Sequence, residues 1–174
     1  MKQRLNQKPR LRGLSVLPAA VCGALILAAD QITKYWISTH FALGESAPFL
    51  KGLIEFSYIH NRGGAWGMLS GKTAFLLILT FAIMVLCIVL LIRFGAKSRL
   101  LLWAIVLVLA GGIGNMIDRI VRDGNVVDFL HFEFFPSFPV FNVADCAIVV
   151  GAGLLILYFL LDAVKKNEEP HADD

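Results

Sequence analysis

Two aspartates, Asp128 and Asp145, have the side chains and the surroundings for acid–base catalysis. Asp128 lies within Val126–Leu130 (VVDFL) and Asp145 ends Phe141–Asp145 (FNVAD), and neither has a lysine or arginine three or four positions away. Two carboxyl groups that converge in an apolar site share one proton, because both cannot ionise together. Such a pair can hydrolyse an amide, since one carboxylate takes a proton from water while the other carboxyl donates one to the carbonyl. A structural polar contact or an ion pathway remains the alternative for this pair.

Asp30 and Lys34 form a second polar group, in which a structural role is favoured. They are four residues apart, so they lie on one face of a helix and can neutralise each other.

A third polar group, Asn115, Asp118 and Arg119, shares one helix face by its spacing, and Arg122 follows Asp118 by four residues. Arg119 can pair with a carboxylate through its planar guanidinium. The spacing predicts that Asp118 stays ionised in a salt-bridged network, which makes it a poor partner in a proton-sharing pair.

Four long apolar stretches must position these residues. The chain has 174 residues, of which 57% are hydrophobic and 17% charged, and its mean hydropathy is +0.72. These values are typical of a membrane protein, and the small net charge of +3 argues against a nucleic-acid partner. A membrane helix needs about 20 apolar residues. The expected spans are 14–36, 73–92, 100–119 and 142–161.

Basic residues predict the orientation of these spans. Ten of the sixteen Lys and Arg residues fall in the short segments 1–12, 93–99 and 163–174. The positive-inside rule therefore places both tails, 1–12 and 163–174, in the cytoplasm. Residues 37–72 and 120–140 then face outward as two outer loops, and Asp128 lies in the second. All the polar groups described above meet near the outer interface.

The first outer loop mixes β-branched and aromatic residues in short runs. Phe49–Ile59 predicts a small β-structure at the membrane surface, followed by a turn at Asn61–Gly64. Trp66 suits either the interfacial aromatic belt or a platform for substrate.

Other chemistries find little support in the sequence. The four histidines lack metal-ligand spacing, and there is neither an H-E-x-x-H nor a G-x-S-x-G motif. The three cysteines lie in apolar stretches without C-x-x-C pairing. We therefore expect neither a metal nor a cofactor.

Five motifs together resemble the bacterial lipoprotein signal peptidase (signal peptidase II) family over roughly residues 14–162. In chain order they are Asp30–Lys34 (DQITK), Asn61–Gly67 (NRGGAWG), Gly111–Arg119 (GGIGNMIDR), Val126–Phe129 (VVDF) and Phe141–Asp145 (FNVAD). The resemblance implies an all-α membrane protein, with four transmembrane helices, a small extracytoplasmic β-cradle and a short periplasmic helix. Residues 1–174 would form a single integral-membrane peptidase domain.

The resemblance also implies an activity and a location. The family consists of metal-independent aspartic endopeptidases of the bacterial cytoplasmic (inner) membrane. They remove the signal peptide from diacylglyceryl-modified prolipoproteins by cutting just before the lipidated cysteine. Their partners are these substrates and the membrane lipids, and globomycin-type cyclic peptides inhibit them. The active site is expected at the outer (periplasmic) face.

Matching positions carry the expected roles. The catalytic pair is Asp128 and Asp145. The residues expected to bind substrate or support the site are Asp30, Lys34, Asn61, Gly63, Gly111, Asn115, Asp118, Arg119 and Asn142.

Two rival functions belong to other classes. A small ion or proton channel predicts ionisable residues at mid-membrane, whereas these lie toward the outer end. A non-catalytic assembly or chaperone protein would depend on its loops and not on its aspartates. Replacing Asp128 and Asp145 separately by asparagine discriminates among the peptidase, the channel and the assembly protein.

Overall fold

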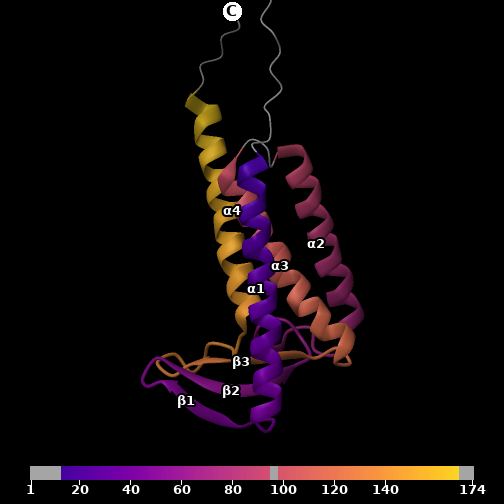
Figure 1. Ribbon diagram of the computed structural model, residues 1–174, viewed down its shortest axis with the longest axis vertical. Helices are drawn as coiled ribbons and strands as arrows, with labels where there is room; N and C mark the ends of the chain where they lie inside the picture. Colours follow the sequence, from indigo (N-terminus) through magenta and orange to yellow (C-terminus); the bar gives the residue numbers. More distant parts are fainter. Residues whose placement is uncertain (1–12, 95–97, 169–174) are drawn as a thin grey trace, which may run out of the picture.

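Four long helices stand side by side on a small sheet (Figure 1). The computed structural model describes residues 13–94 and 98–168; of the expected tails 1–12 and 163–174, only residues 163–168 fall within this part of the chain, and there they continue the last helix. The helices are α1 (Gly13–His40), α2 (Thr73–Phe94), α3 (Arg99–Val121) and α4 (Val143–Glu168). All four are long and apolar enough to cross a membrane. The predicted fold class is confirmed.

Helix α3 forms the centre of the bundle. Within its most apolar 18 residues 56% are buried, against 11–17% in the other three helices. Glycines allow the close packing: a Cβ at Gly111 would collide with the Ala144 carbonyl oxygen of α4, and one at Gly114 would lie 2.5 Å from Asp30 Oδ2 of α1. Helices in lipid associate through such small residues, because the hydrophobic effect does not drive them together.

The sheet has three antiparallel strands in the order β1–β2–β3. Strands β1 (Ser46–Leu50) and β2 (Ile54–Asn61) cover the segment predicted as β-structure. Strand β3 (Val126–Phe132) pairs with β2, opposing Asp128 to Ile59. Asp128 thus lies between α3 and α4, as predicted, but in a strand that was not predicted, because β3 acquires its partner from a segment some 70 residues away in the chain.

The short helix η1 (Ala65–Gly67) follows β2 and is a single 3-10 turn. Its Trp66 has a φ of 54°, a left-handed conformation that is uncommon for residues with a side chain. Among the described residues, this turn corresponds to the short periplasmic helix that was expected.

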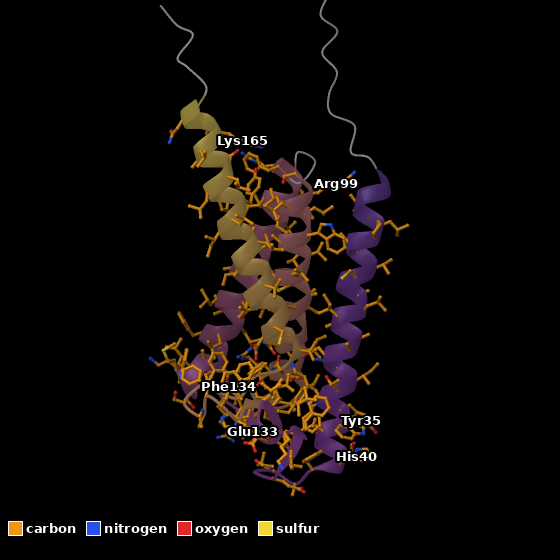
Figure 2. All side chains as sticks on the ribbon, turned by 90° about the vertical axis from the view of Figure 1, so that its left-hand side faces the viewer. Tyr35, His40, Arg99, Glu133, Phe134 and Lys165 are labelled. Atoms are coloured by element: carbon orange, nitrogen blue, oxygen red, sulfur yellow. The ribbon has the colours of Figure 1, made fainter. Side chains whose placement is uncertain are left out.

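The two ends of the bundle differ in composition. Figure 2 shows Arg99 and Lys165 at the end away from the sheet, and Tyr35, His40 and Glu133 at the sheet end. The first residues of α1 and the last of α4 also lie at the end away from the sheet (Figure 1). Both described ends of the chain therefore share one side of the bundle.

Candidate active site

A cavity of about 700 Å³ lies where the sheet meets α3 and α4, and both Asp128 and Asp145 line it. Most of its wall is apolar. The larger apolar residues lining it are Trp66, Phe132, Phe138, Phe141, Ile148 and Val149. An apolar cavity with a few converging polar groups is the usual form of a binding site for an apolar substrate.

Asn142 connects the two carboxyl groups. Its side-chain Nδ2 donates to Asp128 Oδ1 over 2.6 Å, and its backbone N–H donates to Asp145 Oδ2 over 3.2 Å. Its Oδ1 accepts from the backbone N–H of Asp145 at 2.9 Å. These reciprocal bonds form a capping box at the start of α4. The helix cap thus fixes the position of Asp145 relative to Asp128.

Two further asparagines complete the hydrogen bonds to the pair. Asn61 Nδ2 donates to Asp128 Oδ2 at 2.9 Å. Asn115 Nδ2 donates to Asp145 Oδ1 at 2.8 Å. Each of the four carboxyl oxygens therefore accepts one N–H bond, and the donors come from β2, α3 and the start of α4.

The two aspartates differ in exposure. Asp128 is only 1% exposed, whereas Asp145 is half-buried at the cavity wall. Burial, and secondly the negative charge of Asp145, raise the pKa of Asp128 to about 7, although hydrogen bonds from Asn61 and Asn142 oppose this rise. A carboxyl group with this pKa can hold a proton near neutral pH.

Lys34 is the centre of a buried ion cluster behind the pair. Its fully buried Nζ lies 2.9 Å from Asp30 Oδ2 and 3.1 Å from Asp118 Oδ2. It also donates to Asn115 Oδ1 over 3.0 Å. The predicted Asp30–Lys34 pair is present, but the spacing gave no sign that Asp118 of α3 shares the same ammonium group.

This cluster also supports the backbone beside each aspartate of the pair. Asp30 Oδ1 accepts the N–H of Ala144, and Asp118 Oδ2 accepts the N–H of Val127, at 2.9 and 3.1 Å. Ala144 and Val127 directly precede Asp145 and Asp128. The ion cluster therefore positions both carboxyl groups through the main chain.

Arg119 forms no ion pair with a carboxylate among the residues that the structure describes, although its planar guanidinium could form one. In the described part of the chain its guanidinium donates to the carbonyl oxygens of Gly63, at 2.8 Å, and Asn115, at 3.3 Å. Arg122 takes the place beside Asp118, with Nε 3.4 Å from Oδ1. Arg119 thus ties α3 to the turn after β2 at the edge of the cavity.

The two predicted glycines serve close packing. Gly63 has no room for a side chain, since a Cβ there would lie 2.5 Å from the Met68 carbonyl oxygen. Its N–H donates to Asn61 Oδ1 at 2.8 Å, which orients the Asn61 amide toward Asp128. Gly111 lets α3 approach α4 beside Ala144.

Gln31 also belongs to this site, although its spacing did not predict it. Its Nε2 lies within hydrogen-bonding distance of Asp30 Oδ2 at 3.0 Å, of Asp118 Oδ1 at 3.4 Å and of the Gly114 carbonyl oxygen at 3.2 Å. The sequence feature that could have identified Gln31 is its position inside the Asp30–Lys34 motif.

Trp66 lies at the rim of the cavity. Its Nε1 donates to the Ser137 carbonyl oxygen at 3.2 Å, and its ring meets Phe138 edge-on at 6.1 Å. The side chain is 66% exposed. It therefore links the segment after β2 to the loop before α4 across the cavity.

A pair of aspartates facing a cavity at one end of four membrane-length helices is the arrangement expected of an aspartic peptidase of the membrane. The family model described as "Signal peptidase (SPase) II" matches residues 22–161. The chain belongs to the signal peptidase II family.

Individual relatives agree with this assignment. The chain is 40% identical over 146 residues to the lipoprotein signal peptidase of Bacillus subtilis (strain 168), covering 83% of this chain and 94% of that protein. It is 42% identical over 145 residues to the lipoprotein signal peptidase of Enterococcus faecalis (strain ATCC 700802 / V583), covering 83% and 89%. A structure titled "Bacterial membrane enzyme structure by the in meso method at 2.3 A resolution" superposes with a TM-score of 0.79 at 34% identity, covering 94% of this chain and 96% of the other.

We expect Lys34→Met to destabilise the protein. The substitution keeps the length of the side chain but leaves Asp30 buried without a cation and Asp118 with Arg122 alone, a loss of about 3–5 kcal/mol in the free energy of unfolding. Thermal unfolding of the purified protein in detergent should show a melting temperature lower by roughly 10 °C. Lys51→Met, at an exposed position, is the control and should melt as the wild type does. Equal melting temperatures for Lys34→Met and wild type would contradict the role of the ion cluster.

Proposed function

We propose that this chain removes the signal peptide from diacylglyceryl-modified prolipoproteins, cutting just before the lipidated cysteine, with Asp128 and Asp145 as its catalytic pair. Membership of the signal peptidase II family supports the reaction class. One observation supports the choice of residues: Asn142 donates to both carboxyl groups at the wall of an apolar cavity.

The proposed mechanism needs only the two carboxyl groups and water. Asp128 holds the shared proton, in keeping with its pKa of about 7. Asp145 takes a proton from the attacking water while Asp128 donates its proton to the scissile carbonyl oxygen, which gives a tetrahedral gem-diol. Collapse of this intermediate breaks the C–N bond: the proton on Asp145 passes to the leaving amine, and one hydroxyl of the gem-diol returns its proton to Asp128 as the new carboxyl group forms.

The surroundings of the pair suit an anchored substrate. A prolipoprotein held by its signal helix and its lipid presents the scissile bond near the membrane interface, so that anchoring replaces part of the binding that a soluble protease must supply. The apolar cavity wall would contact the signal peptide, and Asn61, Asn115, Arg119 and Asn142 would orient its backbone. Globomycin-type cyclic peptides would occupy the same cavity.

We place the site at the outer face of the bacterial inner membrane, with both termini in the cytoplasm. The basic residues Arg99 and Lys165, at the bundle end away from the sheet, support this orientation (Figure 2).

Replacing Asp128 and Asp118 separately tests the assignment of the pair. Asp128→Asn should fold and bind substrate but lose cleavage, because an amide keeps the size and polarity but cannot carry the proton. Asp118→Asn should lower the melting temperature together with activity, because Asp118 belongs to the Lys34 cluster. Cleavage of a synthetic lipidated peptide and thermal unfolding, both in detergent, give the two readings. The assignment would be refuted if Asp128→Asn cleaved the peptide at a near wild-type rate while a stably folded Asp118→Asn did not cleave it.

The pH profile tests the shared proton. We expect kcat/KM to fall above about pH 7, because the pair then loses the proton that Asp128 holds. Asn61 donates to the Asp128 carboxylate and so lowers its pKa. Asn61→Ala should therefore move the alkaline limb of the profile to higher pH.

Asn125→Ala is the matched control for this shift. Asn125 is also a buried asparagine, but its side chain bonds to Arg62 and to the Arg122 backbone, not to either carboxyl group. The alkaline limb of the pH profile of Asn125→Ala should coincide with that of the wild type. An unmoved limb in Asn61→Ala would argue against Asp128 as the titrating group.

Chelation tests for a metal. We expect EDTA to leave the cleavage rate unchanged, because a carboxylate can activate water by itself. The measurement is kcat/KM on the lipidated peptide before and after dialysis against EDTA. Loss of activity that zinc restores would overturn the two-carboxyl mechanism.

A further inference from the structure

Three basic residues outside the proposed active site gather at one point of the rim where the helices meet the sheet; we call Arg62, Lys72 and Arg122 the cationic rim. The Arg62 carbonyl oxygen accepts the N–H of Gly71, which directly precedes Lys72. Thr73, the next residue, contacts Gly124, two positions after Arg122. Three segments of the chain thus bring the backbones of these residues close together.

A hydrogen bond holds one edge of the Arg62 guanidinium, and an ion pair lies beside that of Arg122. Arg62 Nε donates to Asn125 Oδ1 at 3.1 Å, and Asn125 Nδ2 donates to the Arg122 carbonyl oxygen at 2.8 Å. Arg122 Nε lies 3.4 Å from Asp118 Oδ1. Among the described residues, the terminal nitrogens of both groups have no hydrogen-bonding partner. Their free N–H pairs therefore form two forks with the geometry that arginine uses for phosphate.

The surroundings of the cationic rim are positive on balance. Burial, and then the charges of Arg122 and Arg62, lower the pKa of the neighbouring His60. Asp118 shares the ammonium group of Lys34 with Asp30, so it also offsets part of the charge of Arg122. The exposed Asp123, next to Arg122, offsets part of the positive charge.

Apolar residues lie immediately beside the cationic rim. Ile120 and Val121, at the end of α3, are 65% and 68% exposed and belong to a helix long enough to cross the membrane. Cations at the end of an exposed apolar helix surface match the chemistry of a phospholipid, which has an anionic head and apolar chains.

We propose that the cationic rim binds the phosphate of an anionic phospholipid, whose acyl chains lie over Ile120 and Val121. The Arg62 and Arg122 forks donate to the phosphate oxygens, and Lys72 adds a third positive charge. The inference deepens the proposed function, because it places a lipid site beside the cavity at the same interface. It concerns binding alone, so thermal unfolding tests it independently of cleavage.

The test compares two phospholipids added to the full-length protein in a nonionic detergent. We expect phosphatidylglycerol to raise the melting temperature by about 3 °C more than phosphatidylcholine does, because a ligand that binds only the folded state stabilises it. Arg62→Gln should lose this difference, since glutamine can still donate to Asn125 but carries no charge. Lys72→Gln should reduce the difference, which keeps the test decisive if Arg62→Gln folds poorly.

Two controls define what would overturn the proposal. Lys51→Gln removes an exposed cation in the β1–β2 turn and should retain the full difference between the two lipids. Inorganic phosphate at equal concentration should give no shift. A phosphatidylglycerol effect equal to that of phosphatidylcholine, an unchanged effect in both Arg62→Gln and Lys72→Gln, or the same shift from inorganic phosphate would each refute a site for an anionic lipid.

Discussion

The buried ammonium group of Lys34 is the interaction on which the candidate site depends. A buried carboxylate without a partner costs several kcal/mol, so Asp30 and Asp118 could not both stay ionised at their positions without this cation. As carboxylates, they accept the backbone N–H groups of Ala144 and Val127, the residues immediately before Asp145 and Asp128. Lys34 also donates to the side-chain oxygen of Asn115, which leaves the Asn115 amide directed at Asp145. One positive charge therefore links α1 and α3 to the starts of β3 and α4.

The parts of the structure that depend on local sequence were predictable. Four apolar stretches gave the four helices, and the i, i+4 spacing gave the Asp30–Lys34 pair. Contacts between distant segments were not predictable from spacing. Strand β3 looks like a short apolar loop until β2 pairs with it, and the link from Lys34 to Asp118 crosses from α1 to α3. The contact of Arg119 was not predictable for the same reason, because its guanidinium donates to the carbonyl oxygen of Gly63, 56 residues away.

Polar groups in this site are concentrated where backbone hydrogen bonding is incomplete. A helix leaves its first N–H groups without partners inside the helix, and in a membrane each of them needs another acceptor. At the start of α4, Asp145 accepts the N–H of Asn142, Asp30 accepts that of Ala144, and Asn142 accepts that of Asp145. The carboxylates thus meet a structural requirement of the helix end and, in doing so, are brought close to Asp128.

The same requirement explains why the site lies at the end of the bundle and not in its middle. Further along α4 the backbone is bonded within the helix, so nothing there would hold a carboxylate in place. Strand β3 supplies Asp128 only where the sheet crosses the helix ends, and the chain before α4 is joined to β3 by hydrogen bonds between Leu130 and Phe141, at 2.8 and 2.9 Å. Asp128 and Asp145 therefore both line the cavity at the sheet end of the bundle. In the orientation that we propose, a bond held at the membrane interface by a lipid-anchored substrate would reach this cavity.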